Sequence, residues 1–316
     1  MNSNKTQKII SPLLLTAAAL IWGLAFTAQK AAQDVPAFTT GVTRSLFATV
    51  FLFFIVMIFD RVSGSGRRLI SRRGLDLRKS EIIGGAICGV VLAMASFFQQ
   101  FGINSGTDAG KSAFITALYV VLVPIYALAL KRNAPFNVWI SVAIAVVGFY
   151  FLCVTGDFTV EKSDVFVLIS SLIFPLHILV IDRFLPRCDG VRMSMVQFLF
   201  CALTNLVFAL ILERGTEISV VFDAFMPLLF LGIGSSGIAY TLQILGQRGV
   251  NPAAASIIMS LESVFGVLGA MVILSEKMSK REYLGCAIVF VAVILSQIDF
   301  KAIITKHKEN KNGKAT

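Results

Sequence analysis

Residues 254–274 read AASIIMSLESVFGVLGAMVIL, an almost unbroken apolar run with one carboxylate, Glu262, close to its centre. An α-helix rises about 1.5 Å per residue and the hydrocarbon core of a bilayer is about 30 Å thick, so roughly 20 apolar residues suffice for one crossing. This stretch therefore predicts a membrane-spanning helix with an acid at its middle.

Runs of the same kind recur along the whole chain. Of the 316 residues, 56% are hydrophobic and only 15% are charged, a composition typical of a multispan membrane protein. The runs are continuously apolar rather than alternating, which favours helices over the strands of a barrel. We therefore expect an all-α polytopic membrane protein with ten transmembrane helices, near residues 10–29, 38–59, 82–103, 110–130, 136–155, 164–182, 192–212, 224–245, 252–275 and 282–299.

The loop charges predict an orientation. With both termini in the cytoplasm, 20 of the 28 Lys and Arg residues fall on the cytoplasmic side, seven fall on the opposite side and Arg44 lies within a span. This distribution satisfies the positive-inside rule. The net charge of +10 is then a topology signal for a cell-membrane protein, and anionic lipid headgroups rather than nucleic acid are the expected neighbours of the basic loop at residues 61–79.

No pattern of a catalytic or metal site is visible. The sequence lacks a Gly-rich phosphate loop, a metal-ligand cluster and a nucleophile with an adjacent base, so we expect neither an enzyme nor a cofactor. The cysteines show no paired or metal-ligand spacing, and we interpret them as small packing residues. They are Cys88, Cys153, Cys188, Cys201 and Cys286.

The two halves of the chain resemble each other. When residues 98–130 are placed above 241–274 at an offset of 143, Gln100 falls on Gln243, Gly106 on Gly249 and Leu118 on Leu261. The order of features also agrees, which predicts a tandem of two five-helix units at 10–155 and 164–299, followed by a basic cytoplasmic tail at 300–316.

Five helices per unit is an odd number, so the second unit must enter the membrane from the side opposite to the first. Inverted repeats are a common plan among secondary transporters, in which the binding site lies near the midplane between the repeats. Duplicated bundles also serve as receptors or scaffolds, because a fold alone does not prove a function.

Three phrases resemble a known family. LIWGLAF at residues 20–26, AGKSAFITALYVVLVPI at 109–125 and SLESVFGVLGAMVILSEKMSKREYLGCAIV at 260–289 are similar to the EamA-type members of the drug/metabolite transporter superfamily. In the last phrase that family often has an acid, here Glu262, and a second acid at the turn, here Glu276.

The chain departs from the family pattern at two places. Ser263 stands where the family commonly has proline after the first acid. The turn of the first repeat has Lys131 and Arg132 where the second has Glu276. The resemblance implies a secondary transporter that exports or exchanges a small organic metabolite, amino acid or drug-like compound. Proton coupling and uncoupled facilitative transport both remain open.

Glu262 is the sharpest candidate for a functional residue. It lies roughly 15 Å from both membrane surfaces, too deep for its side chain to reach either one. Gly266 and Gly269 share its helical face and leave space for a ligand or a neighbouring helix. A carboxylate in such a setting can bind and release protons near neutral pH, so it is either a substrate or proton site or a buried acid that bonds another helix.

His177, which follows Pro175 by two residues, is the second candidate for proton coupling. Histidine titrates near neutral pH, which suits a proton relay. A lone histidine in a span is also a common packing residue that is satisfied by another helix.

Two polar and aromatic stripes at helical spacing predict a substrate pocket with aromatic walls. Such a pocket suits an amphipathic organic molecule, and ordinary contact between helices is the alternative explanation. One stripe is Trp22, Phe26 and Gln29, and the other is Ser112, Thr116 and Tyr119, in which Tyr119 holds the position that Glu262 has in the other repeat.

Four further polar residues are expected to have supporting roles. Gln100 and Gln243 coincide under the repeat offset and favour a shared structural role. Arg44 lies some 10 Å deep, where its side chain could extend outward and support the bundle, or attract anionic substrates. Lys111, at the start of its helix, is expected to be solvated.

Overall fold

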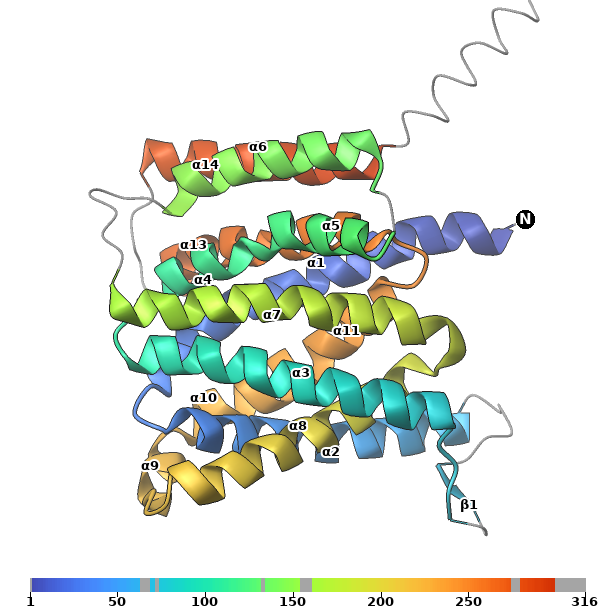
Figure 1. The fold of residues 1–316 in the computed structure, drawn as a ribbon, viewed down its shortest axis with the longest axis vertical. Coiled ribbons are helices and arrows are strands. Elements are labelled where there is room, and N and C mark those ends of the chain that lie inside the picture. The colour runs from blue at the N-terminus through green and yellow to red at the C-terminus, as the bar shows by residue number, and fades with distance from the viewer. Residues whose placement is uncertain are drawn as a thin grey trace, which may run out of the picture.

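The structure is a computed structural model that describes residues 2–62, 69–71, 74–131, 134–153, 161–273 and 279–298. Glu276 and the predicted tail at 300–316 lie outside these residues. Nearly all described residues are helical, and the long helices lie side by side in layers (Figure 1). The elements are α1 (Asn2–Ala31), α2 (Ala37–Val62), β1 (Ile70–Ser71), β2 (Gly74–Leu75), α3 (Lys79–Asn104), α4 (Ala109–Ala117), α5 (Tyr119–Ala129), α6 (Phe136–Cys153), α7 (Lys162–Phe184), the 3₁₀ helix η1 (Leu185–Arg187), α8 (Gly190–Leu212), α9 (Ile218–Asp223), α10 (Phe225–Leu229), the π-helix η2 (Phe230–Ala239), α11 (Tyr240–Gly246), α12 (Pro252–Met259), α13 (Leu261–Ile273) and α14 (Lys280–Gln297).

The described residues contain eight helical stretches that are long and apolar enough to cross a membrane. A shorter apolar helix covers Phe136–Phe151 within α6. The helix α14 has 18 residues but begins with three charged side chains, Lys280, Arg281 and Glu282, and it packs along α6. The prediction of an all-helical, multi-pass protein is confirmed, and eight of the ten predicted spans meet the length and composition of a crossing helix.

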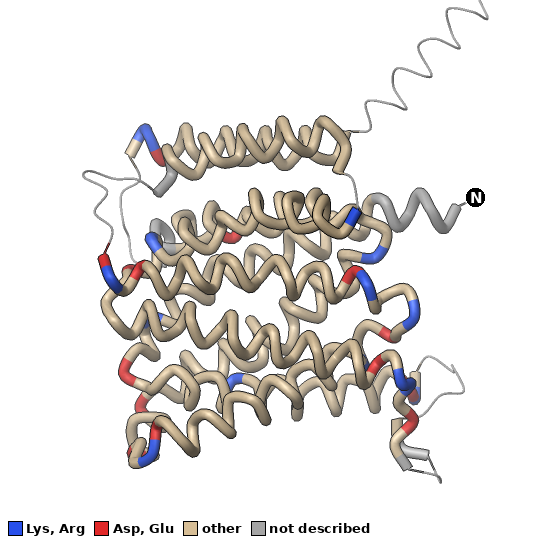
Figure 2. Tube along the Cα trace, in the orientation of Figure 1, with Lys and Arg blue, Asp and Glu red and all other residues tan. Residues whose placement is uncertain are grey.

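The distribution of side chains fits a bilayer. Charged residues gather at the two ends of the helices, and the wide band between the ends contains few of them (Figure 2). On α2, Leu46, Val50 and Phe54 follow one another at helical spacing and are all exposed. An exposed apolar stripe of this kind is stable against lipid rather than water.

The two halves of the chain interleave. The helix α2 packs along α8, α3 along α7, and α6 along α14, while α1 lies against α13 and α11 (Figure 1). Each of these contacts joins a helix of the first half to a helix of the second. The helices α1 and α7, which open the two halves, run in opposite directions, and α1 begins at the end of the bundle where α14 finishes (Figure 1).

Glycine allows the close contact between α1 and α13. A Cβ atom on Gly23 would lie 2.7 Å from the backbone N of Gly266 and 2.8 Å from the carbonyl O of Glu262. Small residues let helix backbones approach in this way. The space that Gly266 and Gly269 leave on their helix is therefore occupied by α1.

Two of the predicted helices are interrupted near their middle. The run 110–130 forms α4 and α5, which meet at Leu118, and the run 252–275 contains α12 and α13, which meet at Ser260. At both positions the backbone makes a hydrogen bond to the residue three positions earlier, as in a 3₁₀ turn. Leu118 N–H donates to Ile115 O at 3.2 Å, and Ser263 N–H donates to Ser260 O at 3.2 Å. Each run still forms one helical stretch of membrane-spanning length, as predicted, with a single turn residue near its middle. The two turns lie within one residue of corresponding positions of the repeats.

Candidate functional site

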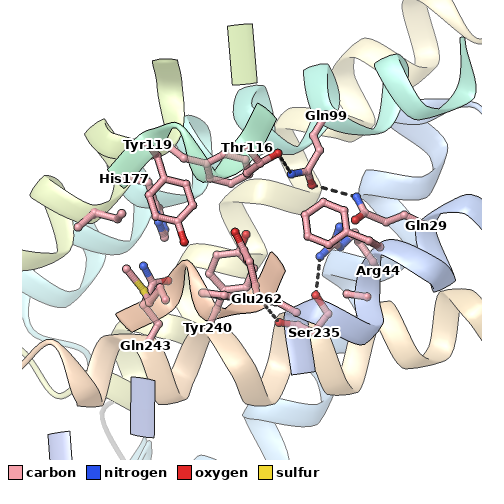
Figure 3. A pocket seen from close by; sticks show the side chains of 16 residues that line it. Gln29, Arg44, Gln99, Thr116, Tyr119, His177, Ser235, Tyr240, Gln243 and Glu262 are labelled. Atoms are coloured by element: carbon pink, nitrogen blue, oxygen red, sulfur yellow. Dashed lines mark hydrogen bonds between the residues drawn. The ribbon is translucent and has the colours of Figure 1, made fainter. Parts of the chain in front are cut away.

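A pocket lies inside the bundle, between the two halves of the chain. It encloses about 510 Å³ of empty space, part of which is open to solvent. Its walls combine aromatic side chains with a few polar groups, and α1, α7 and α11 supply many of them (Figure 3). The lining residues are Trp22, Ala25, Phe26, Gln29, Arg44, Gln99, Thr116, Tyr119, Phe174, His177, Ile178, Ser235, Tyr240, Gln243, Met259 and Glu262.

The helix α1 turns one face toward the pocket. Trp22, Phe26 and Gln29 all line it, as the helical spacing predicts. The Trp22 indole Nε1–H donates to the carbonyl of Ser235 at 3.2 Å, and its ring lies 4.7 Å from that of Tyr240 in an edge-to-face arrangement. Both contacts fix the indole as a wall of the pocket.

The π-helix η2 holds the Arg44 side chain inside the bundle. The guanidinium of Arg44 donates from Nε to Ser236 Oγ at 3.0 Å and from Nη2 to Ser235 Oγ at 3.1 Å. Arg44 is only 7% exposed. The expectation that its side chain extends outward to the surface was wrong, because two hydroxyl groups of η2 bind it at the pocket wall.

The breaks in the two interrupted helices place Tyr119 and Glu262. Tyr119 is the first residue of α5, and Glu262 is the second residue of α13. The hydroxyl of Tyr119 faces the carboxylate of Glu262 across the pocket (Figure 3). Glu262 Oε1 is buried and has no hydrogen-bond partner.

A chain of side-chain hydrogen bonds borders another part of the pocket. Gln29 Nε2–H donates to Gln99 Oε1 at 3.0 Å, and Gln99 Nε2–H donates to Thr116 Oγ1 at 3.0 Å (Figure 3). The chain joins α1, α3 and α4. These amides therefore bind one another at the boundary of the pocket.

His177 lies in the pocket wall but is also bonded to a neighbouring helix. Its Nε2 is 3.0 Å from Gln197 Oε1, and its ring packs edge-on against Tyr240 at 5.6 Å. One ring nitrogen is thus hydrogen-bonded to Gln197 on α8. This contact is compatible with both expected roles of His177, a proton relay and a packing residue.

Two of the predicted residues do not line the pocket. Gln100 donates from Nε2 to the carbonyl of Gln29 at 3.2 Å and to Asn104 Oδ1 at 2.7 Å. Ser112 is fully buried, and its hydroxyl has no partner. Gln243, the repeat counterpart of Gln100, does line the pocket, and its Oε1 is buried without a partner. The Oε1 atom of Gln100 is likewise buried without a partner, and a shared structural role of the two glutamines stays a prediction.

The pocket also contains residues that the sequence analysis missed. Tyr240 contacts the rings of Trp22, His177 and Phe198. A tyrosine within an apolar run is a signal that could have singled it out. The contributions of Gln99 and Ser235 depend on the helices that they face, and their spacing alone carries no such signal. Within the described part of the chain, no group of three or more His, Cys, Asp or Glu side chains could hold a metal ion.

Comparison with known proteins gives consistent results. The sequence profile described as the EamA-like transporter family matches residues 9–154 and again 161–297. An uncharacterized transporter of Archaeoglobus fulgidus is 27% identical over 290 residues, which cover 92% of this chain and 86% of that protein. The uncharacterized transporter YoaV of Bacillus subtilis is 22% identical over 292 residues, 89% of this chain and 94% of its own length.

A solved structure has the same fold. It is titled only as the crystal structure of a protein, and it superimposes with a TM-score of 0.70 over 90% of this chain and 96% of its own, at 18% sequence identity.

Proposed function

Because this chain belongs to the EamA-like transporter family, with two EamA domains, we propose that it is a secondary transporter that moves a small organic solute by alternating access. Family membership makes it a multi-pass membrane protein of a transporter family and not of an enzyme family. The transport mode, the class of solute and the role of the central pocket are our proposal.

The observation that carries the proposal is the composition of the pocket wall. The first EamA domain contributes Trp22, Gln29 and Tyr119, and the second contributes Tyr240 and Glu262. A site built from both domains changes shape when one domain moves against the other. This is what a carrier needs in order to open the same site to either side of the membrane.

The arrangement of the helices supports an inverted repeat. The first helices of the two domains run in opposite directions, and the chain starts and finishes its helices at one end of the bundle (Figure 1). Combined with the excess of Lys and Arg on the inner loops, this favours a cell-membrane protein of ten spans with both termini in the cytoplasm.

Proton coupling would use Glu262. Its carboxylate is buried in the pocket, and one of its oxygens has no partner, so a proton and a solute group can compete for it. His177 is a weaker candidate, because Gln197 already binds it. An uncoupled facilitative carrier is the alternative, and it needs no titrating group in the pocket.

The experiment is a counterflow screen of the purified protein in liposomes. Amino acids, purines, sugars and organic cations, each in labelled form, would be tested for exchange against the same unlabelled solute. At least one solute should accumulate transiently, and Trp22→Ala and Glu262→Ala should abolish this. Trp139→Ala is the matched control, because Trp139 on α6 does not line the pocket. Specific binding without any counterflow would indicate a receptor instead.

A further inference from the structure

We propose that Arg44 is the binding site for an oxyanion of the solute, so that the pocket selects compounds with a carboxylate on an apolar body. The inference rests on the proposed function, since it names the class of solute for the same pocket. It depends on three features of the structure: the partners of Arg44, the position of Glu262, which is the only acid among the described residues that line the pocket, and the residues of the wall beside Arg44.

The charge of Arg44 has no counter-ion in the described part of the chain. An arginine guanidinium carries five N–H donors and stays charged inside proteins. Two neutral hydroxyl groups, of Ser235 and Ser236, accept one hydrogen bond each. No Asp or Glu oxygen of the described residues lies within the 4.0 Å of an ion pair, whereas the buried Arg192 binds Asp60 at 2.6 Å. Three of the five donors of Arg44 therefore remain available at the pocket wall.

An uncompensated cation at bilayer depth is costly. Removing a charge from water costs several kcal/mol unless an opposite charge or several hydrogen bonds replace the solvent. Hydroxyl groups supply hydrogen bonds but no negative charge. A bound oxyanion would supply both, and the planar fork of a guanidinium matches a carboxylate in particular.

Glu262 does not fill this role. Its carboxylate faces Tyr119 instead (Figure 3), and Tyr240 lines the same pocket as Glu262 and Arg44. In the view of Figure 3, Arg44 and Gln29 lie at one end of the pocket, Tyr119 and Gln243 lie at the other, and Glu262 is between them. The carboxylate of Glu262 and the guanidinium of Arg44 therefore line different parts of the pocket and do not form an ion pair.

The wall beside Arg44 suits the apolar body of such a solute. Trp22 and Phe26 line the pocket together with Arg44. The amides of Gln29 and Gln99 are bonded to each other and to Thr116, so they do not bind the guanidinium. A solute with its carboxylate at Arg44 and its apolar body against Trp22 would match both the charged and the aromatic parts of the wall.

A purely structural Arg44, whose only task is to hold η2, is the competing explanation. It predicts that loss of the guanidinium weakens every ligand alike. Ser236→Ala separates the two explanations, because it removes one partner on η2 and keeps the charge. An oxyanion site predicts that this variant retains the preference for carboxylates.

The test uses four probes that share one phenylpropyl body: 3-phenylpropionate, its amide, 3-phenylpropylamine and phenylalanine. Binding to the full-length protein in lipid nanodiscs would be followed by the fluorescence of Trp22 in a Trp139→Phe background, since the chain has two tryptophans. We expect the carboxylate to bind at least about tenfold more tightly than the amide or the amine, the usual effect of a charge-assisted hydrogen bond. In Arg44→Gln the carboxylate and the amide should bind within about twofold of each other.

Each of the remaining outcomes either supports or overturns the oxyanion site. If the amide binds as well as the carboxylate, if Arg44→Gln keeps the preference, or if none of the four probes binds, the proposal is overturned. If Arg44→Gln does not fold, Arg44→Lys replaces it and should retain a weaker preference for the carboxylate. Counterflow of a cationic or neutral solute alone would overturn the oxyanion site and leave the transporter in place. Carboxylate-selective binding without any counterflow would support the oxyanion site and contradict the proposal that the protein is a transporter.

Discussion

Tyr119 and Glu262 face each other across the pocket from corresponding positions of the two EamA domains, 143 residues apart in the sequence. Each lies at the start of a helix that follows a break in its span. A tyrosine hydroxyl can donate to an ionised carboxylate and accept from a protonated one. The two groups are therefore able to form a hydrogen bond in either protonation state of the acid. One repeat has a tyrosine and the other an acid at this position, so the two repeats differ here.

The first prediction concerns Glu262→Gln. Glutamine has nearly the same shape as glutamate and cannot titrate. If Glu262 carries the coupled proton, the variant should transport at least about tenfold more slowly, and its rate should no longer change between about pH 6 and about pH 8. Initial rates of solute uptake into proteoliposomes, with and without a proton gradient, measure both effects.

Tyr119→Phe is the matched control for this variant. It keeps the titrating acid and removes the hydroxyl that faces it, so transport should slow while the dependence on pH remains. A wild-type rate and pH profile for Glu262→Gln would show that the coupled proton does not bind there, and uncoupled transport would then be the better explanation.

The second prediction compares two glycines that lie on opposite sides of one helix contact. In Gly23→Ala the new Cβ would lie 2.7 Å from a backbone nitrogen of α13, so α1 has to move. In Gly266→Ala the nearest atom is 3.5 Å away, an ordinary contact. We expect Gly23→Ala to lower the free energy of unfolding by about 1–3 kcal/mol, the usual effect of overpacking. Gly266→Ala should be neutral or slightly stabilising, because alanine favours helices.

Thermal unfolding in detergent, followed by the loss of soluble monomer, compares the two variants under identical conditions. Equal stability of Gly23→Ala and Gly266→Ala would mean that α1 and α13 do not approach as closely as the structure shows.

Much of the site could be predicted from local spacing. Trp22, Phe26 and Gln29 recur at helical intervals, and Glu262 is an acid in an apolar run, so a pattern within one helix singles out each of them. The duplicated order of features also predicted that Tyr119 and Glu262 correspond. Their positions in the pocket depend on little beyond which face of a helix is turned inward.

The rest depends on contacts between helices that are far apart in the sequence. The burial of Arg44 is decided by two serines that lie more than 190 residues away, and depth alone suggested that its side chain would reach the surface. The role of Gln99 is set by Gln29 and Thr116 on other helices. The breaks at Leu118 and Ser260 contain neither glycine nor proline, so the usual signals of a helix end are missing there.

The third prediction tests the inverted topology. Single cysteines would replace the exposed residues Asp34 and Arg61 in the first domain, and Arg187 and Glu217 in the second, in a variant that lacks the native cysteines. If the two domains are inserted in opposite senses, an impermeant thiol reagent added to whole cells should label positions 34 and 217. Positions 61 and 187 should react only after the membrane is permeabilised. Labelling of 34 and 61 from the same side would contradict the topology.

The fourth prediction concerns an ion pair that joins the two domains. Lys111 was expected to be solvated, but its Nζ lies 2.6 Å from Asp164 Oδ2. The same carboxylate accepts from Thr107 Oγ1 at 3.0 Å and from the backbone N–H of Glu161 at 2.8 Å. The Asp164 side chain is only 4% exposed and that of Lys111 22% exposed. Asp164→Ala should therefore remove the acceptor that these three donors share and lower the free energy of unfolding by about 1–3 kcal/mol.

The apparent melting temperature of the purified protein checks this expectation. Asp34→Ala serves as the control, because Asp34 is an exposed acid in the loop between α1 and α2, and its loss should leave the melting temperature unchanged. Lys111→Ala should cost less than Asp164→Ala, since the carboxylate would still accept the bonds from Thr107 and Glu161. A larger loss of stability from Lys111→Ala would mean that the charge of the lysine, rather than the buried acceptor, holds the two domains together at this end of the bundle.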